Sequence, residues 1–402
     1  MVRGLRVWGL LLAVLFAPSC GSNSAARGGG AAGDDGGADA GDAIPPAKTV
    51  TPGASIYEKP GPAPVGHTTF ELTDAARART LRVEAWYPAD ESARAEASAG
   101  TPLEDLEPAG ANHDAMKKLV LAAPSSCVRK TVHSVADAKP AGAAALPAIV
   151  FSHCLGCVRF SAAAVAERLA SHGFVVVAPD HTGNTLFDRL GGKDLALDAP
   201  TLALRTADVR FVLDSVLDRA SASVPESLRG RFDATKVGMM GHSFGSVTTG
   251  AVLAKDSRFR AGFAIAAPFD LLGDTKLADI HAPTFFLLAR EDNSIGEIGD
   301  VLIRSDFKAL AAPDFLVEVV DAGHWSFSDI CGLDSSFAPG CGRARRQTDT
   351  DSELNYLDNE GARGLAASYA AAFFLGELGG DSAGLAFVAG AHPDGIAVPA
   401  TK

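Results

Sequence analysis

The stretch KVGMMGHSFGSVTTGAVLA, residues 236–254, decides the fold class of this chain. It places Ser243 in a G-x-S-x-G pentapeptide, after the apolar run KVGMM and before the helix-like run VTTGAVLA. A nucleophile elbow needs this order, because a strand that turns sharply into a helix exposes the serine hydroxyl. The pattern therefore predicts that Ser243 is a nucleophile at the carboxyl end of a strand.

A second G-x-S-x-G pentapeptide surrounds Ser382 and lacks this context. It follows a predicted helix and a Gly-Gly break, and only His392 lies further along the chain. We interpret Ser382 as part of a flexible, Gly- and Ala-rich C-terminal tail over residues 379–402.

Strand-like apolar runs alternate with helix-like segments from residue 146 onward. The strand-like runs cover residues 147–151, 174–178, 236–240, 262–267, 284–288 and 315–320, and TLRVEAWY at 80–87 also alternates as a strand; the helix-like segments cover 160–171, 200–220, 244–254, about 297–310 and 362–377. This alternation predicts an α/β domain over residues 56–378, with a mostly parallel sheet, helices on both faces and an irregular insertion at 88–145. Sites in such sheets form where the strands end.

A serine hydroxyl needs a general base, and two downstream histidines lie near predicted strands. His281 precedes a strand and would lie at the wrong end of the sheet. His324 directly follows FLVEVV, in DAGHWSF, at the carboxyl end of its strand. We therefore predict that His324 is the base for Ser243.

An acidic residue must accept the other imidazole N–H of the base and fix its tautomer. Glu291 and Asp292 follow the run TFFLL, and Asp270 follows GFAIAAPF. We favour Asp292, and Asp270 and Glu291 remain alternatives.

The segment FSHCLGC, residues 151–157, allows two interpretations. Its C-x-x-C at the start of a predicted helix is typical of a thiol oxidoreductase, because a helix N-terminus lowers a thiol pKa. The loop after this strand is also where an α/β-hydrolase places half of its oxyanion hole. We favour the second interpretation, with backbone N–H groups of Leu155 and Phe244 as donors, because the redox interpretation leaves Ser243 and His324 unexplained.

The motifs VFSHCLGC, GFVVVAPDHTGNT, KVGMMGHSFGS and DAGHWSFSD together resemble the platelet-activating factor acetylhydrolase and dienelactone hydrolase-like esterases, and more distantly the bacterial cutinases and polyester hydrolases. The resemblance covers roughly residues 65–90 and 145–378. It implies an α/β-hydrolase fold and a serine esterase that needs no cofactor and no metal. It also implies a structural or pocket-lining role for Asp180 and His181.

The sequence departs from this family pattern at three places. Cys154 stands where the family usually has glycine, and Ala266 stands where the acetylhydrolase branch has its acid. The cutinase-like branch has its acid one residue beyond Asp292, where Asn293 stands.

The N-terminal sequence predicts export. Two arginines precede the apolar run 7–16, which is too short to span a bilayer, and the run leads to Ala17-Pro18-Ser19-Cys20. This order resembles a bacterial lipoprotein signal over residues 1–20, with Cys20 as the lipidated residue. Residues 21–55 then read as a disordered Gly/Ala/Asp linker. We expect a membrane-anchored protein outside the cytoplasm, or otherwise a secreted one.

Outside the cytoplasm, cysteines tend to pair. Cys331 and Cys341 bracket a Gly- and Pro-containing loop and are the predicted disulfide, whereas Cys154 and Cys157 would pair with each other or with Cys127. A zinc site would need two close pairs of ligands, which this spacing does not offer.

The formal charge of −12, from 48 acidic and 36 basic residues, argues against a nucleic-acid partner. The sequence therefore favours an esterase that acts on short-acyl esters or acylated lipids and meets the membrane only through its lipid anchor. The alternatives are a hydrolase-like binding lipoprotein whose displaced acid has cost it catalysis, and the thiol oxidoreductase.

Overall fold

The computed structural model describes residues 44–311 and 313–400. The predicted signal peptide, Cys20 and the linker up to residue 43 lie outside these described residues. Residues from Pro46 onward belong to one compact unit. Within it, the Val50 N–H donates to Asp358 Oδ2 at 3.0 Å and Lys48 pairs with Asp321 at 2.7 Å. The predicted linker is therefore too long at its C-terminal end, because these contacts fix residues 46–50 on the domain.

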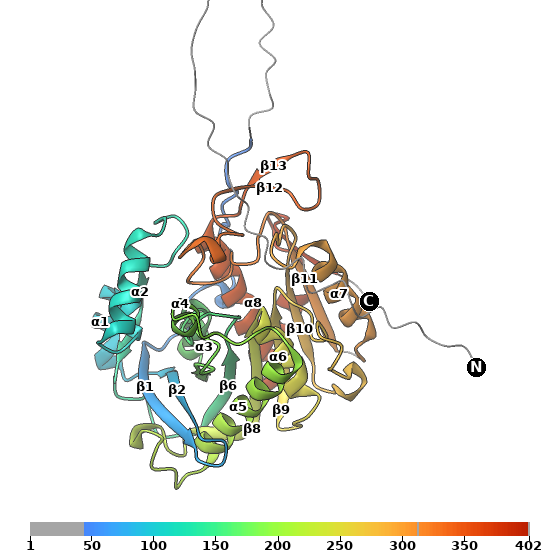
Figure 1. Ribbon diagram of the computed structural model, residues 1–402. Helices are drawn as coiled ribbons and strands as arrows, with labels where there is room; N and C mark the ends of the chain where they lie inside the picture. Colours follow the sequence, from blue (N-terminus) through green and yellow to red (C-terminus); the bar gives the residue numbers. More distant parts are fainter. Residues whose placement is uncertain (1–43, 312, 401–402) are drawn as a thin grey trace, which may run out of the picture. The chain divides into compact units, whose positions relative to one another are not determined.

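A ten-stranded sheet forms the centre of the described chain (Figure 1). Its strands, in spatial order, are β14 (Ala397–Ala400), β11 (Asp314–Val319), β10 (Thr284–Ala289), β9 (Phe259–Ile265), β8 (Phe232–His242), β6 (Leu146–Ser152), β7 (Val175–Pro179), β2 (Arg79–Pro88), β1 (Val65–Asp74) and β5 (Ser134–Ala136). The six strands from β11 to β7 are parallel to one another. Strands β2 and β14 pair antiparallel with β7 and β11. The predicted, mostly parallel sheet is thus confirmed.

The helices include all five predicted from the sequence. They are α1 (Arg94–Ala99), α2 (Ala111–Ala122), α3 (Ala163–Ser171), α4 (Leu186–Leu190), α5 (Ala199–Leu217), α6 (Phe244–Leu253), α7 (Gly296–Ala309), α8 (Asn359–Gly379) and α9 (Ser382–Ala389). No helix among the described residues combines the length and the apolar character needed to cross a bilayer.

Two apolar cores cover the two faces of the sheet, because successive strand residues point to opposite faces. On β6, Ile149 and Phe151 belong to the core that contains α3 and α8. Ala148 and Val150 belong to the other core, which contains residues of α5 and α7. Both faces are apolar along the parallel strands, and this explains their continuous hydrophobic runs.

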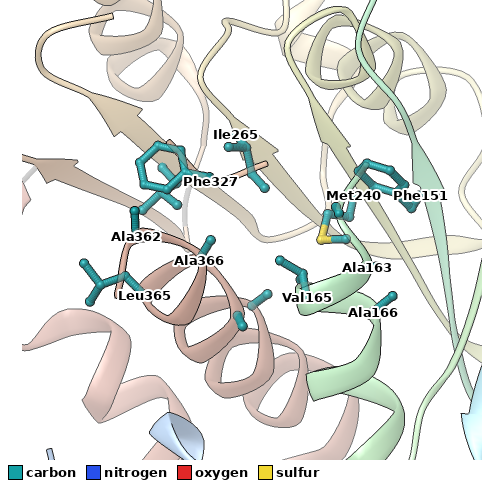
Figure 2. Packing of buried hydrophobic residues seen from close by; sticks show 14 of the residues in the cluster. Phe151, Ala163, Val165, Ala166, Met240, Ile265, Phe327, Ala362, Leu365 and Ala366 are labelled. Carbon is teal, nitrogen blue, oxygen red and sulfur yellow. The ribbon is translucent and has the colours of Figure 1, made fainter. Parts of the chain in front are cut away.

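Small side chains allow α3 and α8 to pack closely under the sheet. Figure 2 shows Val165 of α3 on the side of that helix that faces Ala366 of α8, with Met240 and Ile265 of the sheet above the two helices. These four side chains are at most 1% exposed. The alanine-rich sequence of α8 therefore places a long helix against the strands that carry the candidate site.

The segment 88–145, predicted as an irregular insertion, contains regular structure. It holds α1 and α2, the short pair β3 (Thr101–Pro102) and β4 (Thr131–Val132), and β5 at the sheet edge. Met116 and Val120 of α2 are buried, so this segment contributes to the core.

The predicted flexible tail, residues 379–402, is also corrected over its described part. Residues 382–389 form α9, and residues 397–400 form β14. Apolar burial is the physical reason: Val388 and Ala397 are buried, and Phe387 lies against the rings of Tyr57 and Tyr369.

Candidate active site

Ser243 lies at the sharp turn between β8 and α6. Its backbone has φ 56° and ψ −120°, a conformation that side-chain-bearing residues rarely adopt. The Ser243 N–H donates to the carbonyl of Ile265 at 2.9 Å, and the Ser246 hydroxyl donates to the same carbonyl at 2.8 Å. These bonds to the end of β9 hold the strained turn in place.

The two glycines of the pentapeptide are required by close backbone approaches. A β-carbon at Gly241 would overlap the carbonyl of Gly245, and one at Gly245 would overlap the carbonyl oxygen of Ser152. The helix can therefore begin directly against β6 and β8 only because both positions lack side chains. This places the Ser243 side chain, which is partly exposed, at the carboxyl ends of the strands.

Ser243, His324 and Asp292 lie in one hydrogen-bonded chain. The Ser243 hydroxyl oxygen is 2.8 Å from His324 Nε2, and His324 Nδ1 is 2.7 Å from Asp292 Oδ2. The acceptor at Nδ1 is a carboxylate, so Nδ1 carries the proton and Nε2 is free to accept from the serine. The imidazole of His324 and the carboxylate of Asp292 are both buried.

The Asp292 carboxylate is held from the opposite side as well. Its Oδ1 accepts from the backbone N–H of Ser294 at 2.9 Å and of Ile295 at 2.7 Å. The His324 N–H also donates to the Asp292 carbonyl at 3.1 Å. These bonds link the loop after β10 to the loop after β11, so the acid and the base are positioned together.

The two alternative acids bind elsewhere. Asp270 Oδ1 accepts from the Thr275 N–H at 2.9 Å. The Glu291 carboxylate pairs with Arg346 at 2.9 Å and accepts from the Thr348 hydroxyl at 2.6 Å. Ser382 is exposed on α9, and His281 is exposed just before β10.

His242 contacts the candidate base and was not singled out by the sequence patterns. Its Nε2–H donates to the His324 carbonyl at 2.9 Å, and its ring lies 5.1 Å from that of Trp325. Burial, together with the charge that His324 can carry, lowers the pKa of His242 to about 3. The His242 imidazole is therefore neutral and supports the loop that carries His324. Its position next to Ser243 in the pentapeptide was the one sequence feature that could have pointed to this residue.

The residues whose backbone N–H groups are the predicted oxyanion donors, Phe244 and Leu155, lie at the start of α6 and in the loop after β6. Phe244 is the first residue of α6, where helix geometry provides no intrahelical acceptor for its N–H. Leu155 is partly exposed in the loop after β6. Within the described part of the chain, neither N–H donates to a backbone or side-chain acceptor. Both groups remain able to bind an anion.

A buried polar network underlies this loop. The Arg205 guanidinium donates to the Ser152 hydroxyl at 3.0 Å and to the carbonyl of His153, and its Cζ lies 4.6 Å from the ring centroid of Phe244. Burial lowers the pKa of Arg205 to about 9, although the charge of Asp208 opposes this shift. Arg205 thus contacts both segments that carry the candidate oxyanion donors, the end of β6 before Leu155 and the Phe244 side chain at the start of α6.

Asp180 and His181 take part in the same buried region. Asp180 pairs with Arg159 at 2.9 Å, and His181 Nδ1 lies 3.1 Å from Asp208. His181 Nε2 is 2.9 Å from the Ser152 hydroxyl. Both residues are engaged in internal contacts, as their predicted structural role requires.

The cysteine pairing corrects one prediction. Cys341 forms a disulfide with Cys127 and not with Cys331, which is buried as a free thiol. The fold brings Cys127, in the loop after α2, next to Cys341. The two residues are 214 positions apart, so no local sequence pattern indicates that they are neighbours. Cys154 and Cys157 form the second disulfide.

Comparison with known proteins places the chain in a family. A family model described as platelet-activating factor acetylhydrolase, isoform II, matches residues 48–187 and 206–330. The platelet-activating factor acetylhydrolase of Bos taurus is 31% identical over an alignment of 174 residues, and the match covers 35% of this chain and 39% of the relative. Cutinase est1 of Thermobifida alba is 33% identical over 132 residues, 33% of this chain and 38% of the relative. The matches thus span about two fifths of these relatives.

A solved structure extends the likeness over most of the chain. The ferulic acid esterase from Streptomyces cinnamoneus matches with a TM-score of 0.60 and 23% identity, over 88% of this chain and 100% of the esterase. At this identity the match establishes the α/β-hydrolase fold alone. The family model, by contrast, covers well over half of the 402 residues. The chain therefore belongs to the platelet-activating factor acetylhydrolase isoform II family.

Proposed function

We propose that this protein hydrolyses carboxylic esters with Ser243 as nucleophile, His324 as general base and Asp292 as the orienting acid. The observation that carries the proposal is the hydrogen-bonded chain from the Ser243 hydroxyl through both imidazole nitrogens to Asp292. A serine becomes nucleophilic when a neighbouring base accepts its proton, and that base must be held in one tautomer.

The reaction proceeds in two halves. The Ser243 oxygen attacks the ester carbonyl while His324 Nε2 takes the hydroxyl proton, and the N–H groups of Leu155 and Phe244 stabilise the negative charge on the carbonyl oxygen. His324 then returns the proton to the departing alcohol, which leaves an acyl-serine. Water attacks this intermediate by the same proton transfers and releases the acid.

Apolar side chains around the elbow support a substrate with an apolar acyl chain. Leu155, Leu271 and Ile295 are partly buried and pack on a small core that includes Phe244 and Val247. They come from loops at the same end of the sheet as Ser243. We therefore propose short-acyl or lipid-like esters as the substrate class, because such chains lose apolar surface to water when they bind here.

A fluorophosphonate probe tests the proposed chemistry. The wild-type protein should be labelled and should hydrolyse p-nitrophenyl esters, whereas Ser243→Ala should lose both properties while keeping its circular dichroism spectrum. Ser382→Ala, at the second pentapeptide, is the matched control and should behave as wild type. A folded wild-type protein that neither reacts with the probe nor hydrolyses a series of C2 to C12 esters would refute the proposal.

We also propose that the protein is exported and anchored by lipid at Cys20. Two disulfides in the described domain support an oxidising compartment. In a bacterial host, the full chain should incorporate radiolabelled palmitate and enter the membrane fraction, and Cys20→Ser should abolish the label. Incorporation that persists in Cys20→Ser would contradict the anchor.

A further inference from the structure

The disulfide Cys154–Cys157 encloses the loop that carries one proposed oxyanion donor. Only Leu155 and Gly156 separate its two cysteines, and both cysteines are fully buried. We infer that this disulfide is a positioning element that fixes the Leu155 N–H toward the reacting carbonyl oxygen. The inference rests on the proposed function and concerns residues outside the Ser243, His324 and Asp292 chain.

The direction of the Leu155 N–H is set by the carbonyl of Cys154, because both groups belong to one planar peptide unit. The Cys154 oxygen accepts from His153 Nδ1 at 2.7 Å and from the Cys157 N–H at 3.4 Å. His153 Nε2 accepts from the His181 N–H at 3.0 Å, so the proton lies on Nδ1 and points to Cys154. A trans peptide directs its N–H opposite to its carbonyl, so these bonds aim the Leu155 N–H away from the buried side of the loop.

The C-terminal end of the loop closed by the Cys154–Cys157 disulfide is held by hydrogen bonds to the rest of the domain. The Cys157 carbonyl accepts from the Leu186 N–H at 2.7 Å, and the Gly156 N–H donates to the Asn184 carbonyl at 3.2 Å. Gly156 has φ +61°, a conformation that glycine adopts easily and that lets the chain reverse between the two cysteines. The disulfide joins this fixed end to Cys154, whose peptide carries the donor.

Global stability does not account for a disulfide of this kind. In the chain-entropy description, a disulfide stabilises a fold more when it closes a longer loop. Cys154–Cys157 has a sequence separation of 3, whereas Cys127–Cys341 has one of 214. The Cys154–Cys157 disulfide is therefore expected to add much less to the free energy of unfolding than Cys127–Cys341. Its effect should instead be on the local geometry of its loop.

The expected effect is on the chemical step. A donor that is not held at the oxyanion position stabilises the transition state less, while binding of the substrate chain is unchanged. Loss of a whole donor costs about 10²–10³ in kcat, so loss of its alignment should cost roughly 10- to 100-fold. KM should change by less than about 3-fold, since the apolar contacts remain.

The two disulfides allow a crossed experiment. Cys154→Ala/Cys157→Ala is compared with the control Cys127→Ala/Cys341→Ala for kcat, KM and Tm, with active sites counted by fluorophosphonate titration so that only folded protein is compared. Each protein also receives a p-nitrophenyl ester and the matching thionoester, in which sulfur replaces the carbonyl oxygen. Sulfur accepts hydrogen bonds weakly, so preference for the oxygen ester reports on the oxyanion donors.

We expect the 154/157 variant to lose kcat and part of its preference for the oxygen ester, with a small change in Tm. The 127/341 variant should lose more Tm and keep that preference. Unchanged kcat in the 154/157 variant, or a fall in kcat with the preference intact, would overturn the inference. A wild-type protein without esterase activity would instead refute the proposed function, before any cysteine variant is compared.

Discussion

Gly245 lies directly against the carbonyl oxygen of Ser152, so the first turn of α6 contacts the end of β6 through backbone alone. This approach brings the elbow that carries Ser243 next to the loop that carries Leu155. The same contact joins the two segments that supply the proposed nucleophile and the proposed oxyanion donors.

We expect Gly245→Ala to lose activity and stability together. The added methyl group would overlap the Ser152 carbonyl, and backbone atoms must shift to relieve it, at a cost of about 3 kcal/mol or more. Urea unfolding and ester hydrolysis measure both effects. Gly364→Ala in α8 is the matched control, because nothing lies within 4 Å of its added β-carbon and alanine favours the helix. Equal stability of Gly245→Ala and wild type would contradict this packing.

We expect Asp292→Asn to lower kcat by about 10⁴, because an amide can hold His324 in the wrong tautomer. The backbone N–H bonds at Oδ1 can persist, so the fold should remain. Asp270→Asn is the control and should change kcat by less than about 2-fold, since its carboxylate binds the Thr275 N–H instead. Steady-state kinetics of both variants decides the assignment, and the reverse pattern would move the acid to Asp270.

The free thiol of Cys331 should be inert in the native protein. Burial raises its pKa to about 12, so thiolate is scarce at neutral pH and the reagent has no access. In a Cys20→Ser protein, Ellman's reagent should find no thiol before denaturation and one thiol in unreduced, denatured protein. Peptide mapping without reductant should recover Cys127 linked to Cys341. A peptide that links Cys331 to Cys341 would disprove this pairing.

Asp300 should make stability depend on pH. Burial, with the nearby charge of Asp292, raises its pKa to about 8, and its Oδ1 is buried with no hydrogen-bond partner among the described residues. An acid that binds its proton more tightly when folded stabilises the fold below its unfolded pKa, near 4, and this contribution is lost as the pH rises to about 8. The permanently neutral Asp300→Asn should therefore gain stability relative to wild type, on the order of 2 kcal/mol, between pH 4 and pH 8.

Chemical unfolding of Asp300→Asn and wild type at pH 5, 6.5 and 8 measures this difference. Glu297→Gln is a control on the same helix, because its carboxylate is exposed. A difference that stays constant from pH 5 to pH 8 would show that Asp300 is ionised throughout this range and would contradict the prediction.

The parts of the fold that repeat a strong local pattern could be predicted from the sequence. The parallel strands have continuous apolar runs because both of their faces are buried, and G-x-S-x-G between a strand and a helix specifies the elbow around Ser243. The short strands β5 and β14 have three and four residues and too little pattern to detect. Their pairing depends on neighbours that only the complete fold provides.

The candidate site divides in the same way. His324 could be predicted because it lies in the loop that follows β11, but Asp292 and Glu291 are neighbouring carboxylates in one loop, and the sequence does not distinguish them. Tertiary contacts separate them, since Arg346 approaches from the distant β12 (Arg343–Arg345) and β13 (Glu353–Asn355) hairpin and pairs with Glu291. The partner of Cys341 is similarly hidden, because pairing across a large part of the chain leaves no local mark.

Strand β14 also has a consequence for solubility. It is the outermost strand on one side of the sheet and pairs with the edge of β11. Pro399, which lies opposite Val317, has no N–H that could pair with another chain. Deleting residues 397–402 would leave backbone N–H and C=O groups of β11 unpaired and create a template for intermolecular strand addition. Shortened versions of the protein that end before this strand should therefore aggregate even when the proposed catalytic residues are intact.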